Sequence, residues 1–348
     1  MAKDPSHINP ELPEKGQRLL TADAYVEGIL SGDRYMLSRA ITIVESRAEK
    51  YRKVAIEILD RCMPRAGNSI RVGITGVPGV GKSSFIEKLG LHVIEKGKRL
   101  AVLAIDPSSR ISKGAILGDK TRMEKLSARA SAFIRPSATG HSLGGVARKT
   151  RESIILCEAA GFDVVFVETV GVGQSETAVS HMVDFFLLLV LAGAGDELQG
   201  IKRGIMELAD AIVINKADGK NLENAEKARM AYLRALQLFP PKESGWSPPV
   251  MTASALSGLH LPRLWDAVEA YRKHTQENKY WEARRKEQLR QWLHESFEDL
   301  IYQRLHDDEA LNRQMKQLEN EVIQARLSAA GAASLLFKSW VEGLHGKG

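Results

Sequence analysis

Residues 76–83 read Gly76-Val77-Pro78-Gly79-Val80-Gly81-Lys82-Ser83, three glycines followed by a lysine and a serine. The β-branched segment before them, Ser69 to Thr75, predicts a short strand. The segment after them, residues 83–96, carries apolar side chains at helical spacing. A strand, a glycine-rich loop and a helix in this order predict a Walker A phosphate-binding loop.

The residue types of this loop suit the phosphates of a nucleotide. Glycines let the backbone wrap around an anion, so that successive N–H groups and the helix N-terminus point at it. Lys82 is predicted to reach the β and γ oxygens, and Ser83 to ligate Mg²⁺. A glycine turn without a ligand is the alternative, and the flanking strand and helix argue against it.

Composition and charge are those of an ordinary globular protein. The 348 residues are 44% hydrophobic and 26% charged, enough for one large α/β domain with helical additions. The formal net charge of +6 could indicate a nucleic-acid or membrane surface, but basic residues mostly have acidic neighbours, as in residues 282–287. Solvated helix faces explain this pattern better, so no nucleic acid and no membrane is expected as a partner.

Cysteine usage and the N-terminal sequence bear on localisation. Cys62 and Cys157 are far apart and lie in apolar helical patterns, which is typical of core residues in a reducing compartment. Residues 1–25 contain no apolar signal-peptide stretch, and the apolar run 185–192 is too short to span a bilayer. We expect a cytoplasmic protein.

The chain is predicted to have three regions. Residues 1–67 form an N-terminal helical arm with two helices between Asp23 and Pro64. Residues 68–275 form a P-loop domain of the α/β class, with a mainly parallel sheet between helical layers. Its expected strands are 69–75, 99–106, 132–136, 162–169, 185–192, 210–215 and 249–254. Residues 276–348 form a C-terminal helical region for dimerisation.

The C-terminal region contains a regular apolar seam. Leu311, Met315, Leu318 and Val322 repeat at 4-3-4 spacing between charged residues. Such a seam fits a helix packed against another helix, either in a second subunit or within the same chain.

Asn215-Lys216-Ala217-Asp218 follows a predicted strand and matches the guanine-recognition motif. The Asp218 carboxylate can accept hydrogen bonds from guanine N1–H and the 2-amino group, whereas adenine would leave it unpaired. Ser254-Ala255-Leu256 resembles the loop that supports guanine through main-chain N–H groups. The sequence therefore predicts GTP and GDP, rather than ATP, as ligands. The predicted nucleotide-binding residues are Gly76, Val77, Pro78, Gly79, Val80, Gly81, Lys82, Ser83, Ser84, Asn215, Lys216, Asp218, Ser254, Ala255 and Leu256.

Three acidic residues are candidates for the Mg²⁺ site. Asp106 and Glu168 end predicted strands, and the carboxyl ends of parallel strands face the ligand crevice. A hard cation that bridges phosphates prefers one or two protein oxygens beside Ser83. Asp106 could instead be a turn residue before a proline, and Asp119 without further information would be a loop residue.

Glu168-Thr169-Val170-Gly171 stands where many GTPases have Asp-x-x-Gly, so the N–H of Gly171 can meet the γ-phosphate. Val172 follows, where small signalling GTPases have the glutamine that orients the attacking water. Hydrolysis by the isolated protein is therefore expected to be slow. Gln174 and Glu176 lie close enough in sequence to take the role of that glutamine.

An ordered set of longer sequence motifs resembles the ArgK/MeaB family of P-loop GTPases, which includes the human methylmalonic aciduria type A protein. The motifs are residues 106–109, 116–123, 168–176, 193–200 and 215–218, and the whole match runs from about Asp33 to Trp265. The resemblance implies a homodimeric G-protein chaperone of an adenosylcobalamin-dependent acyl-CoA mutase, usually methylmalonyl-CoA mutase. GTP hydrolysis would gate cofactor delivery from an adenosyltransferase and the removal of damaged cofactor.

The resemblance also implies roles for particular residues. Mg²⁺ or its water shell would be held by Ser83, Asp106, Asp119 and Glu168. Three switch segments would contain Asp119 and Lys120, then Gly173, and then Asp196, Gln199 and Lys202. The residues predicted to act in hydrolysis are Lys82, Glu168, Gly171, Gln174 and Lys202.

Three other functions compete with this one. A nickel-insertion GTPase usually carries clusters of His or Cys ligands, and the nine histidines here are scattered. An ATP-using kinase linked to amino-acid transport would have to accommodate adenine against Asp218. A nucleotide-switched adaptor with negligible turnover stays open. Because the chain contains no Asp-x-His-x-x-Gly corrinoid word, any effect on cobalamin must pass through the partner.

Overall fold

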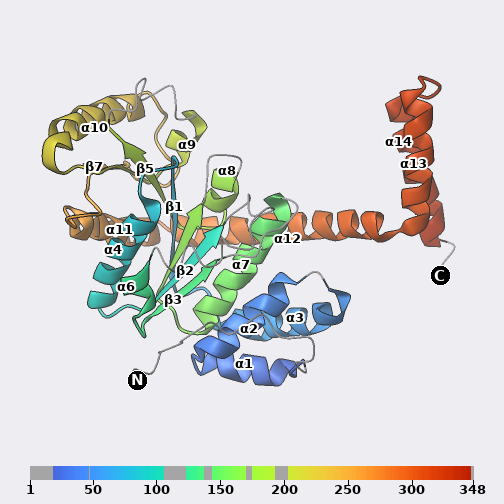
Figure 1. The fold of residues 1–348 in the computed structure, drawn as a ribbon, viewed down its shortest axis with the longest axis horizontal. Helices are drawn as coiled ribbons and strands as arrows, with labels where there is room; N and C mark the ends of the chain where they lie inside the picture. The colour runs from blue at the N-terminus through green and yellow to red at the C-terminus, as the bar shows by residue number, and fades with distance from the viewer. Residues whose placement is uncertain are drawn as a thin grey trace, which may run out of the picture. The chain divides into compact units, whose positions relative to one another are not determined.

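The computed structural model describes residues 19–46, 48–105, 123–136, 143–169, 175–192 and 203–345. The chain divides into two units, Met1–Glu282 and Ala283–Gly348. The first unit is an α/β domain with three N-terminal helices, and the second is helical (Figure 1).

Within the described residues, seven strands form one sheet in which every neighbouring pair is parallel. Its order is β3-β2-β4-β1-β5-β6-β7. The strands are β1 (Ile70–Gly76), β2 (Leu100–Ile105), β3 (Ala132–Pro136), β4 (Val164–Thr169), β5 (Phe185–Leu191), β6 (Ala211–Asn215) and β7 (Val250–Thr252). This confirms the P-loop α/β fold and the predicted strands, and shows that the described sheet is wholly parallel.

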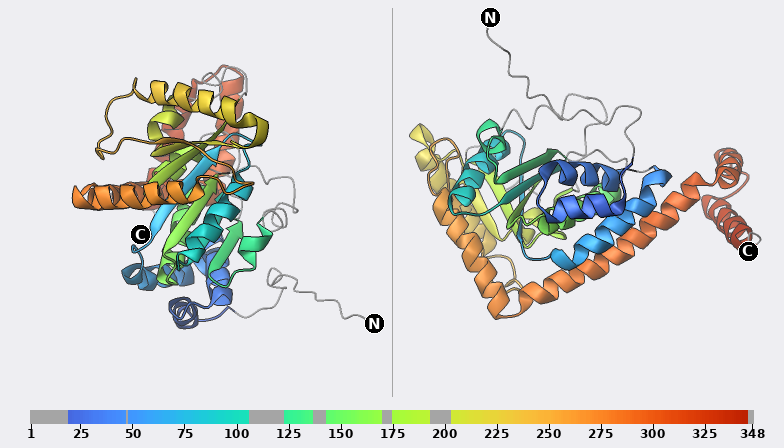
Figure 2. Two further views of the ribbon diagram at one scale, coloured as in Figure 1. Left: turned by 90° about the vertical axis from the view of Figure 1, so that its left-hand side faces the viewer. Right: turned by 90° about the horizontal axis from the view of Figure 1, so that it is seen from below.

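Helices cover both faces of the sheet, so its strands consist of nearly continuous apolar residues (Figures 1 and 2). On one face, Val72, Phe166 and Leu187 pack with α4, α6 and α11. On the other, Leu188 and Ile212 belong to a second apolar cluster, with α9 and α10. The helices are α4 (Lys82–Glu95), α6 (Glu124–Ser127), α7 (Leu143–Ala159), α8 (Ser175–Ser180), α9 (Arg203–Leu208), α10 (Leu222–Leu236) and α11 (Leu261–Glu277).

Three N-terminal helices occur where the sequence predicted two: α1 (Ala22–Leu30), α2 (Arg34–Glu45) and α3 (Glu49–Cys62). The prediction was wrong about α1, a short helix of 9 residues. The Thr21 side chain caps its N-terminus, and it buries Tyr25 and Ile29. The hydrophobic periodicity is hard to recognise in so short a segment. Tertiary packing, rather than intrinsic helix propensity, stabilises such a helix.

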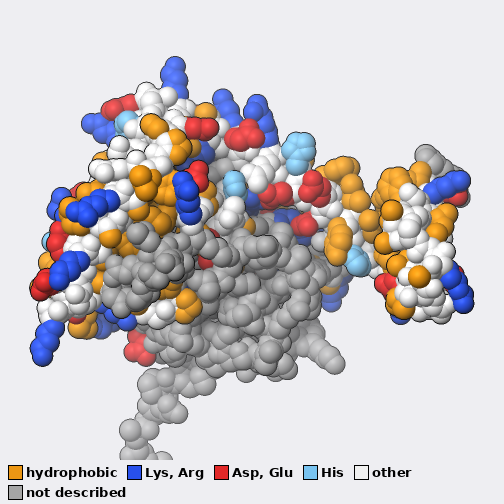
Figure 3. All heavy atoms as spheres, turned by 90° about the horizontal axis from the view of Figure 1, so that it is seen from above, with side chains coloured by type: hydrophobic (Ala, Val, Ile, Leu, Met, Phe, Trp, Pro, Cys, Tyr) orange, Lys and Arg blue, Asp and Glu red, His pale blue; other side chains and the backbone are white. Residues whose placement is uncertain are grey.

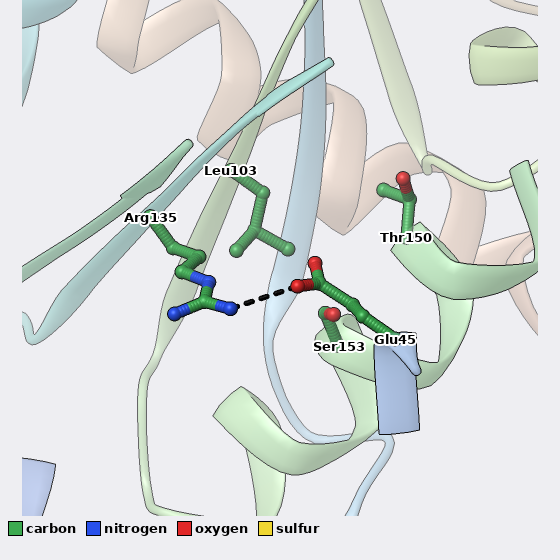
Figure 4. Close-up of a pocket in the computed structure, with 5 residues that line it drawn as sticks. All are labelled: Glu45, Leu103, Arg135, Thr150 and Ser153. Carbon is green, nitrogen blue, oxygen red and sulfur yellow. Dashed lines mark hydrogen bonds and ion pairs between the residues drawn. The ribbon is translucent and has the colours of Figure 1, made fainter. Parts of the chain in front are cut away.

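Arg135 on β3 attaches α2 to the sheet. Its guanidinium donates to Glu45 at 2.8 Å, and it also donates to Ser38 and Thr42 on the same helix face. Leu103 of β2 and Thr150 and Ser153 of α7 line a narrow pocket with the pair (Figure 4). Glu45 is only 4% exposed in its side chain, so this contact is an internal ion pair.

Aspartates before three strands fix the register of the sheet at its amino end. Asp163 accepts a hydrogen bond from the backbone N–H of Arg99 at 2.8 Å, and Asp184 accepts one from Arg71 at 2.8 Å. Asp210 accepts one from the N–H of Phe186 at 2.9 Å. Each carboxylate thus satisfies a donor at the beginning of the neighbouring strand, where the ladder has no partner.

The second unit contains most of α12 (Tyr280–Asp307), then α13 (Glu309–Ile323) and α14 (Ala329–His345). α13 packs against α14, which explains the burial of Leu311 and leaves Met315 39% exposed. Hydrophobic side chains also lie on the surface of these helices (Figure 3). Among them, Leu293 and Phe297 of α12 are exposed. Among the residues that the structure describes, no helix combines the length and apolar character needed to cross a bilayer.

Candidate nucleotide-binding site

The glycine-rich loop joins β1 to α4 as the sequence predicted, with the helix beginning one residue earlier, at Lys82. Gly81 has φ +89°, a left-handed conformation that only glycine adopts easily. At Gly76, an added Cβ would lie 2.4 Å from the carbonyl oxygen of Leu189, so glycine is required there for space. The side chain of Val80 is buried in the hydrophobic core and anchors the loop there, while Pro78 and Gly79 are exposed.

Lys82 folds over this loop. Its Nζ donates to the carbonyl oxygen of Gly76 at 2.7 Å and to that of Val77 at 3.4 Å. Burial lowers the pKa of Lys82, whereas the charges of Glu168 and Glu176 raise it. The two hydrogen bonds hold the ammonium beside the loop whose N–H groups would face a phosphate.

The carboxyl end of β4 supplies oxygen atoms next to the loop. Ser83 Oγ donates to Glu168 Oε1 at 3.5 Å, and the Glu168 residue is 3% exposed. Thr169 Oγ1 donates to Thr75 Oγ1 at 2.8 Å, which ties the ends of β4 and β1 together. A hydroxyl and a carboxylate are the hard oxygen donors that Mg²⁺ prefers, so Ser83 and Glu168 fit the predicted metal site.

Asn215 connects the phosphate loop to the predicted guanine loop. Its Nδ2 donates to the carbonyl oxygen of Val80 at 2.7 Å, and its Oδ1 accepts from the N–H of Ala255 at 3.2 Å. Lys216 Nζ reaches Gly79 O at 2.8 Å. Three segments that are far apart in sequence thereby form one site at the carboxyl edge of the sheet.

Asp218 is held in place by the guanine loop. Ser254, which is fully buried, donates its hydroxyl to Asp218 Oδ2 and also accepts from the N–H of Ser257 at 3.2 Å. Leu256 is 82% exposed next to it. The carboxylate thus has a fixed orientation, as recognition of two guanine donors requires.

Several predicted site residues lie outside the described residues: Asp106, Asp119, Lys120, Gly171, Gly173, Gln174, Asp196, Gln199 and Lys202. Ser84 is exposed on the first turn of α4.

The contact between Thr75 and Thr169 was not predicted from the sequence. The only signal was a threonine near the end of each of two strands, and the pairing of those strands is not visible in a sequence.

Comparison with known proteins agrees with this site. The sequence model described as methylmalonyl-CoA mutase-associated GTPase MeaB matches residues 37–310. A probable GTPase of Mycobacterium tuberculosis is 48% identical over 318 residues, 91% of this chain and 95% of the relative. The GTPase ArgK of Escherichia coli is 44% identical over 292 residues, 84% of this chain and 88% of the relative.

Two further matches cover similar lengths. The mitochondrial methylmalonic aciduria type A homolog of Mus musculus is 40% identical over 339 residues, 94% of this chain and 81% of the relative. A crystal structure named LAO/AO transport system kinase is 36% identical, with a TM-score of 0.73 over 93% of this chain and 100% of that one. The chain therefore belongs to the MeaB family of methylmalonyl-CoA mutase-associated GTPases, and it is a GTPase.

Proposed function

We propose that this GTPase is a G-protein chaperone of an adenosylcobalamin-dependent acyl-CoA mutase, namely methylmalonyl-CoA mutase. GTP binding and hydrolysis would gate the loading, protection and reactivation of the mutase cofactor. The family match carries the proposal, because it runs from α2 into α13 and includes every described residue of the nucleotide site. The family's description names the mutase, and the mouse relative is named for methylmalonic aciduria.

The described residues account for nucleotide binding. The loop of residues 76–83 would surround the β-phosphate, with Lys82 on the β and γ oxygens. Ser83 and Glu168, together with Asp106 and Asp119, would hold Mg²⁺, whose charge offsets the negative charge that develops on the phosphates. Asp218, held by Ser254, would select guanine.

The slow intrinsic rate is part of the proposal. Val172 stands where a glutamine would orient the attacking water, so the mutase has to complete the catalytic arrangement. The switch and catalytic residues in this scheme are Asp119, Lys120, Gly171, Gly173, Gln174, Asp196, Gln199 and Lys202. A homodimer in the cytoplasm, served by an adenosyltransferase, completes the scheme, and corrinoid is contacted only by the partner.

An ATP-using kinase is a second candidate function, because the solved relative is named LAO/AO transport system kinase. The Asp218 carboxylate, which Ser254 holds in place, can accept from the N1–H and 2-amino group of guanine, and adenine would leave it unpaired. This argues against an ATP-using enzyme. Transfer of the γ-phosphate of ATP to an acceptor other than water would support the kinase instead.

Protection of the mutase tests the proposal. A cobalamin-dependent acyl-CoA mutase from the same source is followed during turnover until it loses activity, with and without this protein and GTP. The mutase should remain active several-fold longer when both are present. Lys82→Ala, which removes the phosphate-binding cation, should give no protection. Equal rates of inactivation in all mixtures would contradict the proposal.

A further inference from the structure

Thr75 and Thr169 form a hydrogen-bonded pair of buried hydroxyls between β1 and β4. Thr169 Oγ1 donates to Thr75 Oγ1 at 2.8 Å, and the residues Thr169 and Thr75 are 0% and 1% exposed. Valine has nearly the same shape and suits a buried parallel strand at least as well. Because a valine pair would bury no hydroxyl, packing alone does not account for two threonines at this place.

The pair lies one residue beyond the last backbone pair of β1 and β4. The printed register between these two strands ends at Ile74 and Glu168. On their other sides the pairing goes further, since β4 pairs with β2 as far as Thr169 and β1 pairs with β5 as far as Gly76. The hydroxyl pair therefore continues the connection between β1 and β4 after their register ends.

Residues of the nucleotide site adjoin the pair on both strands. Thr75 immediately precedes Gly76, the first residue of the phosphate loop. Thr169 immediately follows Glu168, whose Oε1 accepts from Ser83 Oγ at 3.5 Å. A shift of the end of β4 relative to β1 would therefore move the Glu168 carboxylate relative to the loop and to Ser83.

The two threonines lie on the face of the sheet that α8 covers. Successive side chains of a strand point to opposite faces, so Thr75 shares a face with Gly73. An added Cβ at Gly73 would lie 2.9 Å from Val179 Cγ1 of α8, which shows how closely this face is covered. A hydrogen bond that is enclosed in this way does not compete with bulk water, so it can fix the positions of both strands.

We propose that Thr75 and Thr169 are positioning residues for Mg²⁺-dependent GTP hydrolysis. Their hydrogen bond holds the end of β4 against the beginning of the phosphate loop, so that the Glu168 carboxylate and Ser83 keep the separation that the metal and its water shell require. The threonines act through Glu168 and do not contact the nucleotide. The proposal rests on the proposed Mg²⁺ site and is independent of the role as a mutase chaperone.

A Thr75→Val/Thr169→Val double variant tests the proposal, because it keeps the shape of both side chains and removes both hydroxyls. Its denaturant midpoint should stay close to that of the wild type, since no buried hydroxyl is left unpaired. The Mg²⁺ concentration that half-maximally slows release of a fluorescent GDP analogue should rise about 10-fold, as for the loss of a contact that orients a metal ligand. The Mg²⁺ concentration for half-maximal GTP hydrolysis should rise with it. Without Mg²⁺, GDP affinity should change less than about threefold, because the N–H groups of the loop are unchanged.

Three single variants calibrate the measurement. Thr169→Ser keeps the hydroxyl and should show the Mg²⁺ dependence of the wild type. Thr275→Val removes another fully buried hydroxyl, which donates to the carbonyl oxygen of Tyr271 on α11 at 2.8 Å, and should also behave as the wild type. Glu168→Gln changes the proposed metal residue itself and should raise the required Mg²⁺ concentration.

Three results would overturn the assignment. A shift in E168Q without a shift in the double variant would remove the threonines from metal positioning and leave the metal site intact. No shift in either variant would overturn the proposed metal site as well. Equal losses of GDP affinity with and without Mg²⁺ would show that the threonines only maintain the loop. If the double variant does not fold, Thr169→Val is compared with T169S: a shift in T169V alone supports the proposal, and equal Mg²⁺ dependence overturns it.

Discussion

Asp218 and Ser254 are 36 positions apart in sequence, yet one hydrogen bond between them orients the carboxylate that we propose reads the base. The motif of residues 215–218 could be predicted from sequence, because its residue types and its place after a strand match the guanine-recognition motif. The hydroxyl that holds the carboxylate could not, because a serine in a Ser-Ala-Leu tripeptide has no distinctive pattern. The same limit applies to Thr75 and Thr169, which meet only because β1 and β4 are neighbours.

Asp218→Asn tests base recognition at the residue scale. An amide can donate to the 2-oxo group of xanthine but cannot accept from both guanine donors, so GDP affinity should fall about 10- to 100-fold. Affinity for xanthosine diphosphate should rise. Asp266→Asn, an exposed change on α11, serves as the control and should bind GDP normally. Retained preference for guanine in D218N would mean that another residue reads the base.

At the scale of elements, the apolar runs predicted the strands because a parallel sheet covered on both faces leaves little room for polar residues. The sequence could not predict that Asp163, Asp184 and Asp210 fix the register of the sheet. The N–H groups that donate to these carboxylates belong to neighbouring strands, and the order of the strands is not known from sequence. α1 was also missed, because its stability depends on packing against α2 and α3. Sequence thus predicts the elements better than the contacts between them.

The contact between β1 and α8 can be tested at Gly73. Gly73→Ala forces a methyl group against Val179 and Val183, so the free energy of unfolding should fall by about 1–3 kcal/mol. Gly204→Ala is the matched control, because an added Cβ in α9 meets nothing within 4 Å and removes a flexible helical glycine. Denaturant unfolding should show G204A as stable as wild type or more so. Equal stability of G73A and wild type would mean that α8 does not lie this close.

The ion pair between Arg135 and Glu45 can be tested in the same way. Glu45→Ala leaves the Arg135 guanidinium without its carboxylate, which should cost about 3 kcal/mol and lower Tm by several degrees. Glu226→Ala breaks an exposed pair with Arg229 and should leave Tm within about a degree. A Tm of E45A equal to that of wild type would show that α2 is not attached through this pair.

At the scale of the whole molecule, the second unit leaves an apolar stripe on α12. Leu289, Leu293, Phe297 and Leu300 are between 37% and 70% exposed and recur at helical spacing. Such a stripe supports the proposed homodimer, because exposed apolar surface of this kind marks sites of association.

Analytical sedimentation, which measures the oligomeric state, tests this proposal directly. The wild-type protein should sediment as a dimer, and a Leu293→Glu/Phe297→Glu variant as a monomer, with basal GTP hydrolysis unchanged as evidence of folding. A monomeric wild type at micromolar concentration would contradict the proposal, as would a variant that still forms dimers.

The proposed chaperone function is tested most directly by the rate of Mg²⁺-dependent GTP hydrolysis by the purified protein, alone and with a cobalamin-dependent acyl-CoA mutase from the same source. The basal kcat should be below about 1 s⁻¹, because Val172 stands where small signalling GTPases have the glutamine that orients the water. Saturating mutase should raise that rate at least tenfold. A rate that does not respond to the mutase would contradict the proposed chaperone function.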